Sequence, residues 1–197
     1  TRSSCDWSSD VCSSDLKILK KLKFKKNHTI LNFMSTIHNS ELKKIIFPAN
    51  QIFKIAPLPM IKYNLGPIVI YPKNKIIEKF FNKLGKVIAT NDEKENKKLW
   101  VMTSFMATYL EIFNTAHKWF VKKGINPNTS KKYINHLFKA LNNELLKNTN
   151  YSLDSMIKEF QTKGGINAEL LMRTKKSGIF KNLDKGFNKI YNRIKKS

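Results

Sequence analysis

The stretch PIVIYPKNKIIEKFFNKLGKVIA (residues 67–89) holds two short apolar runs on either side of an amphipathic segment. The runs at residues 67–71 and 87–89 are rich in Ile and Val and have the length of β-strands. Residues 74–84 have the apolar spacing of a helix, and Gly85 follows as a residue typical of helix ends. The stretch therefore predicts a strand–helix–strand unit. The side chains that we expect to face inward from its helix are Ile76, Ile77, Phe80 and Phe81.

A second unit of the same kind precedes this stretch. Residues 29–34 and 51–56 are compact apolar runs of strand length. Between them, residues 39–46 predict a helix with a polar capping residue at its start and Pro48 just after its end. Because strands that alternate with helices are typical of α/β proteins, we predict an α/β region over residues 17–90.

The remainder of the chain shows helical patterns and no convincing strand. Residues 92–122 predict one long helix that is apolar on nearly all sides between residues 99 and 121, so we expect it at the centre of a helical core that subunits share. The later helices are expected to start at Asn126, Ser152 and Asn167, with a last helix over residues 180–194. The sequence therefore predicts an all-helical second domain over residues 91–197.

The first sixteen residues differ in composition from the rest. They hold six Ser, three Asp and both Cys but no Lys, Ile or Asn, whereas the remainder holds 34 Lys, 21 Ile and 21 Asn. The run CDWSSDVCSSDL (residues 5–16) resembles a sequencing-adapter oligonucleotide translated in frame, so we expect residues 1–16 to be non-native and the true N-terminus to be missing. We then expect no disulfide or metal site at Cys5 and Cys12. A cysteine-free remainder fits a cytoplasmic protein.

The chain is strongly basic, with a formal net charge of +23, and the cations are 34 Lys but only 3 Arg. Arg supplies the bidentate contacts to phosphate and guanine, so its scarcity weakens a nucleic-acid interface. The lysines are also spread along the whole chain. The composition therefore favours a solvated lysine-rich surface, with nucleic-acid binding as the weaker alternative. No apolar run has membrane-spanning length, and the four His show no metal-ligand spacing, so we expect neither a membrane span nor a metal.

Four segments, in this order, resemble pyrroline-5-carboxylate reductase. They are IAPLP (residues 55–59), GPIVIYP (66–72), TSFMATY in the long apolar helix (103–109) and FQTKGGIN (160–167). The likeness is closest to a divergent, reductase-like branch of that family and extends from residue 16 to the C-terminus.

The resemblance implies a division of the chain into two domains. Residues 17–90 are then the last part of a Rossmann domain, and residues 91–197 are the helical dimerisation domain. A homodimer is implied as well. The family transfers a hydride from a nicotinamide to the carbon of a small cyclic imine while the imine nitrogen is protonated, as a step of proline biosynthesis.

The resemblance also implies contacts to NADP or NAD at two places. One is the loop after a late Rossmann strand, and the other is a Met-Pro-Asn turn of the family, where Leu58 replaces the Asn. Loops at the carboxyl ends of strands face the cofactor in such sheets. The residues implied to contact the cofactor are Phe33, Met34, Ser35, Ala56 and Pro57.

The substrate contacts implied by the resemblance fall on the helical part. The ring donors are Thr103 and Ser104, and the substrate carboxylate is assigned to Gly164, Gly165 and Asn167. Phe105 and Met106 stand where the family has small residues, so the same fold acting on another imine or a 2-hydroxy acid remains an alternative. From the residues alone, Gly164 and Gly165 also fit a plain turn, and a Thr on an apolar helix often bonds back to the preceding turn.

The strand–turn–helix motif G-x-G-x-x-G that seats a dinucleotide pyrophosphate does not occur in the sequence. The residue that would discriminate NADH from NADPH belongs to the same missing region. We therefore expect the chain as written to be an inactive part of an NAD(P)-dependent reductase. The residues also leave open a different function, that of a basic helical nucleic-acid-binding module.

Overall fold

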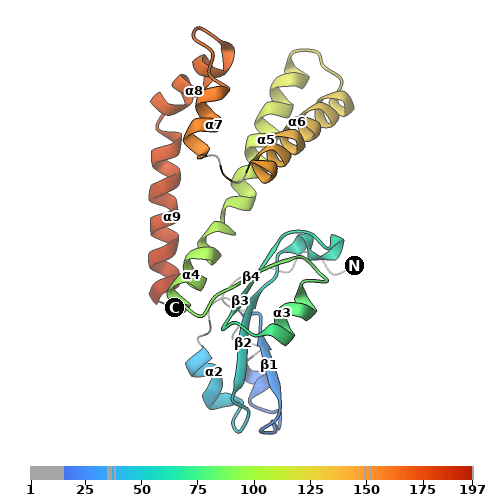
Figure 1. The fold of residues 1–197 in the computed structure, drawn as a ribbon, viewed down its shortest axis with the longest axis vertical. Helices are drawn as coiled ribbons and strands as arrows, with labels where there is room; N and C mark the ends of the chain where they lie inside the picture. Colours follow the sequence, from blue (N-terminus) through green and yellow to red (C-terminus); the bar gives the residue numbers. More distant parts are fainter. Residues whose placement is uncertain (1–15, 35–36, 38, 149, 151, 197) are drawn as a thin grey trace. The chain divides into compact units, whose positions relative to one another are not determined.

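The computed structural model describes residues 16–34, 37, 39–148, 150 and 152–196 (Figure 1). Ser35, Cys5 and Cys12 lie outside the described residues. The chain forms two compact units. The first comprises Thr1–Thr103 with Asn188–Ser197, and the second comprises Ser104–Phe187.

The first unit is built on a four-stranded mixed sheet with the strand order β1-β2-β3-β4. The strand pairs β1–β2 and β3–β4 are parallel, and a helix connects the two strands of each pair, as the sequence predicts. The central pair β2–β3 is antiparallel and is joined through the short 3₁₀ helix η1. The bounds are β1 (Thr29–Asn32), α2 (Asn39–Ile45), β2 (Gln51–Ala56), η1 (Pro59–Tyr63), β3 (Pro67–Tyr71), α3 (Lys75–Phe81) and β4 (Lys86–Ala89).

Strand β2 carries the core of the first unit, because its five residues after Gln51 are all buried. Side chains alternate between the faces of a strand, so Ile52 and Lys54 share one face and Phe53 and Ile55 the other. Ile52 joins a cluster under α2, whereas Phe53 and Ile55 join a second cluster that includes Phe81 of α3. The two crossover helices therefore cover opposite faces of the sheet.

Helix α3 presents a narrower face to the sheet than the sequence predicts. Ile77 and Phe81 pack against the core cluster, but Ile76 and Phe80 are 79% and 57% exposed, so the inward placement of these two was wrong. The helix has only seven residues, and one row of side chains four residues apart is all that reaches the sheet. Asn74 caps it by accepting hydrogen bonds from two backbone N–H groups of the first turn.

The predicted long helix over residues 92–122 is two helices, α4 (Glu93–Met102) and α5 (Phe105–Lys122). At the break, the Thr103 N–H and hydroxyl both donate to the carbonyl oxygen of Trp100, at 3.1 and 2.8 Å. A bond over three residues tightens the turn, and the hydroxyl competes for the carbonyl that an α-helix would use. This competition ends α4 and was not visible in the apolar pattern.

Five helices form the rest of the described chain, namely α5, α6 (Pro127–Lys147), α7 (Leu153–Glu159), α8 (Ile166–Lys176) and α9 (Ile179–Lys196). Asn126 caps α6 and Ser152 caps α7, as predicted. Asn167 was wrongly expected to cap α8, because Gly165 holds the cap position and Asn167 lies in the first turn.

Helices α5 and α6 form a hairpin that packs through aromatic rings and a partly buried hydrogen bond. Phe113 and Phe138 meet with ring centroids 5.9 Å apart, and Phe120 and Tyr133 at 5.8 Å. The fully buried Ser130 hydroxyl lies 2.9 Å from Nδ1 of a histidine on α5. This hairpin is the best-packed part of the second unit.

The two units differ sharply in how much apolar surface they bury. Thirteen of the described apolar side chains are buried in the first unit, whereas in the described part of the second unit only Ile134 and Met156 are. Helix α5 has no buried residue although it is rich in apolar side chains. Among the described helices, none is both long and apolar enough to cross a membrane.

We predict that Gly85→Ala destabilises the first unit. A Cβ at this position would lie 2.7 Å from the carbonyl oxygen of Gly66, so backbone must move, at a cost of about 1–3 kcal/mol. The matched control is Gly186→Ala in α9, where a Cβ meets nothing within 4 Å and helix propensity favours Ala by about 1 kcal/mol. Thermal unfolding followed by circular dichroism compares the two variants. An unchanged unfolding temperature for Gly85→Ala would contradict this packing.

Candidate active site

The candidate site residues divide between the two units. Those in the first unit are Phe33, Met34, Ala56, Pro57 and Thr103, and those in the second are Ser104, Gly164, Gly165 and Asn167.

The structure brings the cofactor candidates of the first unit to one edge of the sheet. Strands β1 and β2 are parallel, and Asn32 pairs with Lys54 in register, so the loop that begins with Phe33 and Met34 leaves the sheet beside the end of β2. Ala56 and Pro57 lie at that end. The carboxyl ends of parallel strands are where α/β sheets bind ligands, and Phe33, 43% exposed, is accessible there.

Two polar side chains beneath this edge were not singled out from the sequence. Asn32 is 1% exposed and Lys54 is 7% exposed. Asn32 Oδ1 accepts a hydrogen bond from the Met34 N–H at 2.9 Å, and Lys54 Nζ donates to the Ile37 carbonyl oxygen at 3.2 Å. The signal that was available is the Lys in the otherwise apolar run IFKIA, since an unpartnered buried ammonium is costly.

Thr103 uses its hydroxyl proton within the chain, as one of the two interpretations of the sequence expects. Its Oγ1 donates to the carbonyl oxygen of Trp100 at 2.8 Å. In this rotamer the hydroxyl offers only lone pairs to a ligand. Ser104 is exposed at the start of α5.

Gly164 and Gly165 form a tight turn before α8. Gly164 has φ +74°, a left-handed conformation that favours glycine, and the Gly165 N–H donates to the carbonyl oxygen of Thr162 at 2.9 Å. A Cβ on Gly165 would lie 2.3 Å from Thr162 Oγ1 and 3.1 Å from the Thr162 carbonyl oxygen, so a side chain there would require the Thr162 hydroxyl to move. Asn167 is exposed in the first turn of α8, where backbone N–H groups lack intrahelical partners.

Phe105 begins α5 as a half-buried ring, in the segment where the resemblance implied small side chains. Its centroid lies 6.0 Å from that of Phe187 in an edge-to-face contact. Met106 beside it is also half-buried. The start of α5 is therefore filled by large apolar side chains.

Tyr71, at the end of β3, has a shifted pKa. Burial raises the pKa of Tyr71 above its ordinary value of 10.0, and the nearby carboxylates of Glu93 and Asp92 raise this pKa further. The Tyr71 hydroxyl therefore stays protonated at neutral pH. In the described part of the chain no group of three or more metal-binding side chains occurs.

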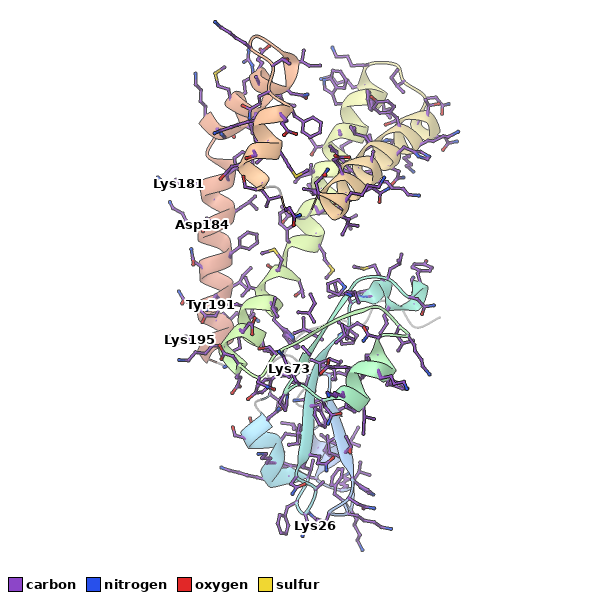
Figure 2. The ribbon with its side chains drawn as sticks, in the orientation of Figure 1. Lys26, Lys73, Lys181, Asp184, Tyr191 and Lys195 are labelled. Atoms are coloured by element: carbon purple, nitrogen blue, oxygen red, sulfur yellow. The ribbon has the colours of Figure 1, made fainter. Side chains whose placement is uncertain are left out.

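The lysines are spread along the sequence. Lys26, Lys73, Lys181 and Lys195, labelled in Figure 2, lie on widely separated parts of the sequence. Clustered Arg and Lys are the electrostatic footprint of nucleic-acid-binding proteins.

Three solved structures share this arrangement of a mixed sheet followed by helices. The reductase from Plasmodium falciparum matches with a TM-score of 0.81 over 93% of this chain and 77% of its own, at 16% identity. The chain has the fold of pyrroline-5-carboxylate reductases. The enzyme from Streptococcus pyogenes matches at 0.80 over 92% and 71% with 17% identity, and that from Coxiella burnetii at 0.74 over 95% and 70% with 15% identity.

The likeness to pyrroline-5-carboxylate reductases lies in the fold, since the identities are below 20%. The Plasmodium falciparum structure is described as having NADP bound. No protein-family model matches the chain, and no curated protein matches its sequence.

Proposed function

We propose that the chain is the C-terminal part of an NAD(P)-dependent reductase of the pyrroline-5-carboxylate reductase type. The observation that carries the proposal is the match in fold to these reductases over more than nine-tenths of the chain. In this proposal residues 1–16 are not native, residues 17–90 end a Rossmann domain and residues 91–197 form the dimerisation domain. The reaction is one step of proline biosynthesis, and the protein works in the cytoplasm.

The cofactor is assigned to the carboxyl edge of β1 and β2. Support comes from the parallel register that sets the loop after β1 beside the end of β2, and from the NADP described in the Plasmodium falciparum reductase. A bound nicotinamide would supply the hydride. The chain's seven glycines contain no G-x-G-x-x-G, so the proposal assigns the pyrophosphate turn to residues encoded upstream. The residues proposed to contact the dinucleotide are Phe33, Met34, Ser35, Ala56 and Pro57.

The substrate contacts are assigned to the helical region. Thr103 and Ser104 are the proposed hydrogen-bond donors to the ring. The Thr103 proton is donated to a backbone carbonyl in the structure, so Thr103 must rotate before it can donate to the substrate. The backbone N–H groups at Gly164, Gly165 and Asn167, at the positive end of the α8 dipole, are the proposed carboxylate site. The Gly165 N–H must exchange its bond to Thr162 for one to substrate.

A different cyclic imine or a 2-hydroxy acid is the second candidate substrate. The observation that favours it is the Phe105–Phe187 contact at the start of α5, where large rings stand in place of the small residues implied by the resemblance. Large side chains at this position would leave less space for the substrate ring, while the hydride-transfer chemistry would stay the same.

The direct test is a turnover assay on the protein expressed with the natural coding sequence upstream of Lys17. We predict that it oxidises NADPH in the presence of 1-pyrroline-5-carboxylate or a related imine, and that Ser104→Ala lowers kcat by at least about 10-fold because one positioned donor is lost. The 197-residue chain is the control and is expected to be inactive. An extended protein that neither binds NADPH nor reduces any cyclic imine or oxidises any 2-hydroxy acid would overturn the proposal.

A second copy of the chain is the proposed partner of the second unit. One row of α6, with residues four positions apart, consists of Tyr133, Leu137, Leu141 and Leu145, which are 60%, 44%, 38% and 42% exposed. Rows of this kind pack against another helix in helical bundles. A homodimer covers such rows on both copies at once, because symmetric interfaces use the same patch twice.

We predict that Leu141→Lys weakens this dimer. Burying a Leu side chain in an interface contributes about 1.5–3 kcal/mol to the stability of the dimer. The variant should therefore unfold at a lower temperature, and its unfolding temperature should no longer depend on protein concentration. The control is Asn143→Lys, which adds the same charge on the opposite side of α6. Equal behaviour of the two variants in thermal unfolding would exclude this row from the interface.

A further inference from the structure

Lys54 is an ammonium buried in the middle of the first unit. Only 7% of the residue is exposed, and it shares a face of the sheet with the apolar Ile52. Removing a charge from water costs several kcal/mol unless nearby groups compensate. The contacts that Lys54 makes must therefore offset the free-energy cost of its burial.

The first of these contacts is to the loop between β1 and α2. Lys54 Nζ donates to the Ile37 carbonyl oxygen at 3.2 Å, and the side-chain amide of Asn32 donates to the same oxygen at 3.5 Å. Asn32 also accepts from the Met34 N–H at 2.9 Å and donates to Asn39 Oδ1 at 3.2 Å. Two neighbouring side chains at the ends of the strands therefore hold the backbone at Met34 and at Ile37.

The second contact is to helix α4. Lys54 Nζ lies over the indole ring of Trp100, 5.1 Å from its centroid, within the range of a cation–π interaction. The indole Nε1–H is a donor and cannot accept a hydrogen bond from the lysine, so the contact between Lys54 and Trp100 is made through the ring face. The carbonyl oxygen of Trp100 accepts both hydrogen bonds that fix Thr103.

One ammonium thus contacts both the loop that follows β1 and the helix that ends at Thr103. We propose that Lys54, together with Asn32, is a positioning residue that sets Met34 and Ile37, beside the proposed cofactor contacts, relative to α4. The inference rests on the proposed function, because the loop and Thr103 matter only if a nicotinamide and its substrate bind there. All of these residues belong to the first unit, so the link does not depend on the second.

The experiment compares three variants in the protein expressed with its upstream coding sequence. Lys54→Met removes the ammonium and keeps the length of the side chain, Lys54→Arg keeps the charge and the stacking, and Lys62→Met is the matched control. Lys62 also lies over an aromatic ring, at 4.8 Å from the centroid of Tyr63, but on the exposed helix η1. Folding is checked by circular dichroism.

We expect Lys54→Met to raise KM for NADPH by about 10-fold, since small displacements of contact groups cost one to two orders of magnitude. Lys54→Arg should restore KM to within about 3-fold of the wild type, because a guanidinium supplies the same donor and stacks on aromatic faces. Lys62→Met should leave KM unchanged. A folded Lys54→Met protein with normal KM for NADPH overturns the inference.

A second variant keeps the test decisive if Lys54→Met does not fold. Trp100→Leu removes the ring face and leaves the bond from Lys54 to the loop, so we expect kcat to fall while KM for NADPH stays near that of the wild type. Amide hydrogen exchange of the 197-residue chain gives an independent readout, and we expect the Met34 amide to stay protected in Trp100→Leu. A wild-type kcat in folded Trp100→Leu contradicts the link to α4.

The failures of the two proposals differ. If the wild-type protein does not bind NADPH, the proposed function fails and this inference fails with it. If the wild type binds and turns over but the Lys54 and Trp100 variants match it, only the positioning role is overturned.

Discussion

The helices of residues 104–187 carry more apolar surface than they bury among themselves. In the described part of this unit Ile134 and Met156 are the buried apolar side chains, while α5 exposes large side chains such as Leu110 and Trp119 at 63% and 57%. Burial of apolar surface is the main source of folding free energy, at roughly 25 cal/mol per Å². Covering these side chains would stabilise the unit, and the proposed second copy would cover them with the same surface on both copies.

The first unit, in contrast, buries most of the apolar side chains of its sheet. Strand β2 is buried after its first residue, and the helices α2 and α3 cover its two faces with separate apolar clusters. Lys54 is buried within this sheet, and its contacts to the Ile37 carbonyl oxygen and to the Trp100 ring offset part of the loss of hydration.

Patterns local in sequence predicted most of the elements. The strands at residues 51–56 and 67–71 and the caps at Asn126 and Ser152 follow from apolar runs and side-chain chemistry within a few residues. The wrong predictions arise from long-range packing or from hydrogen bonds that compete with the apolar pattern. Ile76 and Phe80 have helical spacing but lie beyond the reach of the sheet, and the hydroxyl of Thr103 ends a helix that the apolar pattern would continue.

The sequence predicted less of the candidate site than of the fold. The loop residues came from the resemblance alone, and their assignment stays a prediction. The buried pair beneath the loop was missed because Lys54 and the carbonyl of Ile37 are 17 residues apart, which no local pattern connects. An isolated Lys within IFKIA was the one local sign of it.

Sedimentation velocity of the 197-residue chain over a range of protein concentrations tests the dependence on a second copy most directly. We expect a species of twice the 22.9 kDa mass of the chain, with dissociation accompanied by loss of helical circular dichroism. A monomer that keeps its full helical signal and unfolds cooperatively at every concentration would contradict it.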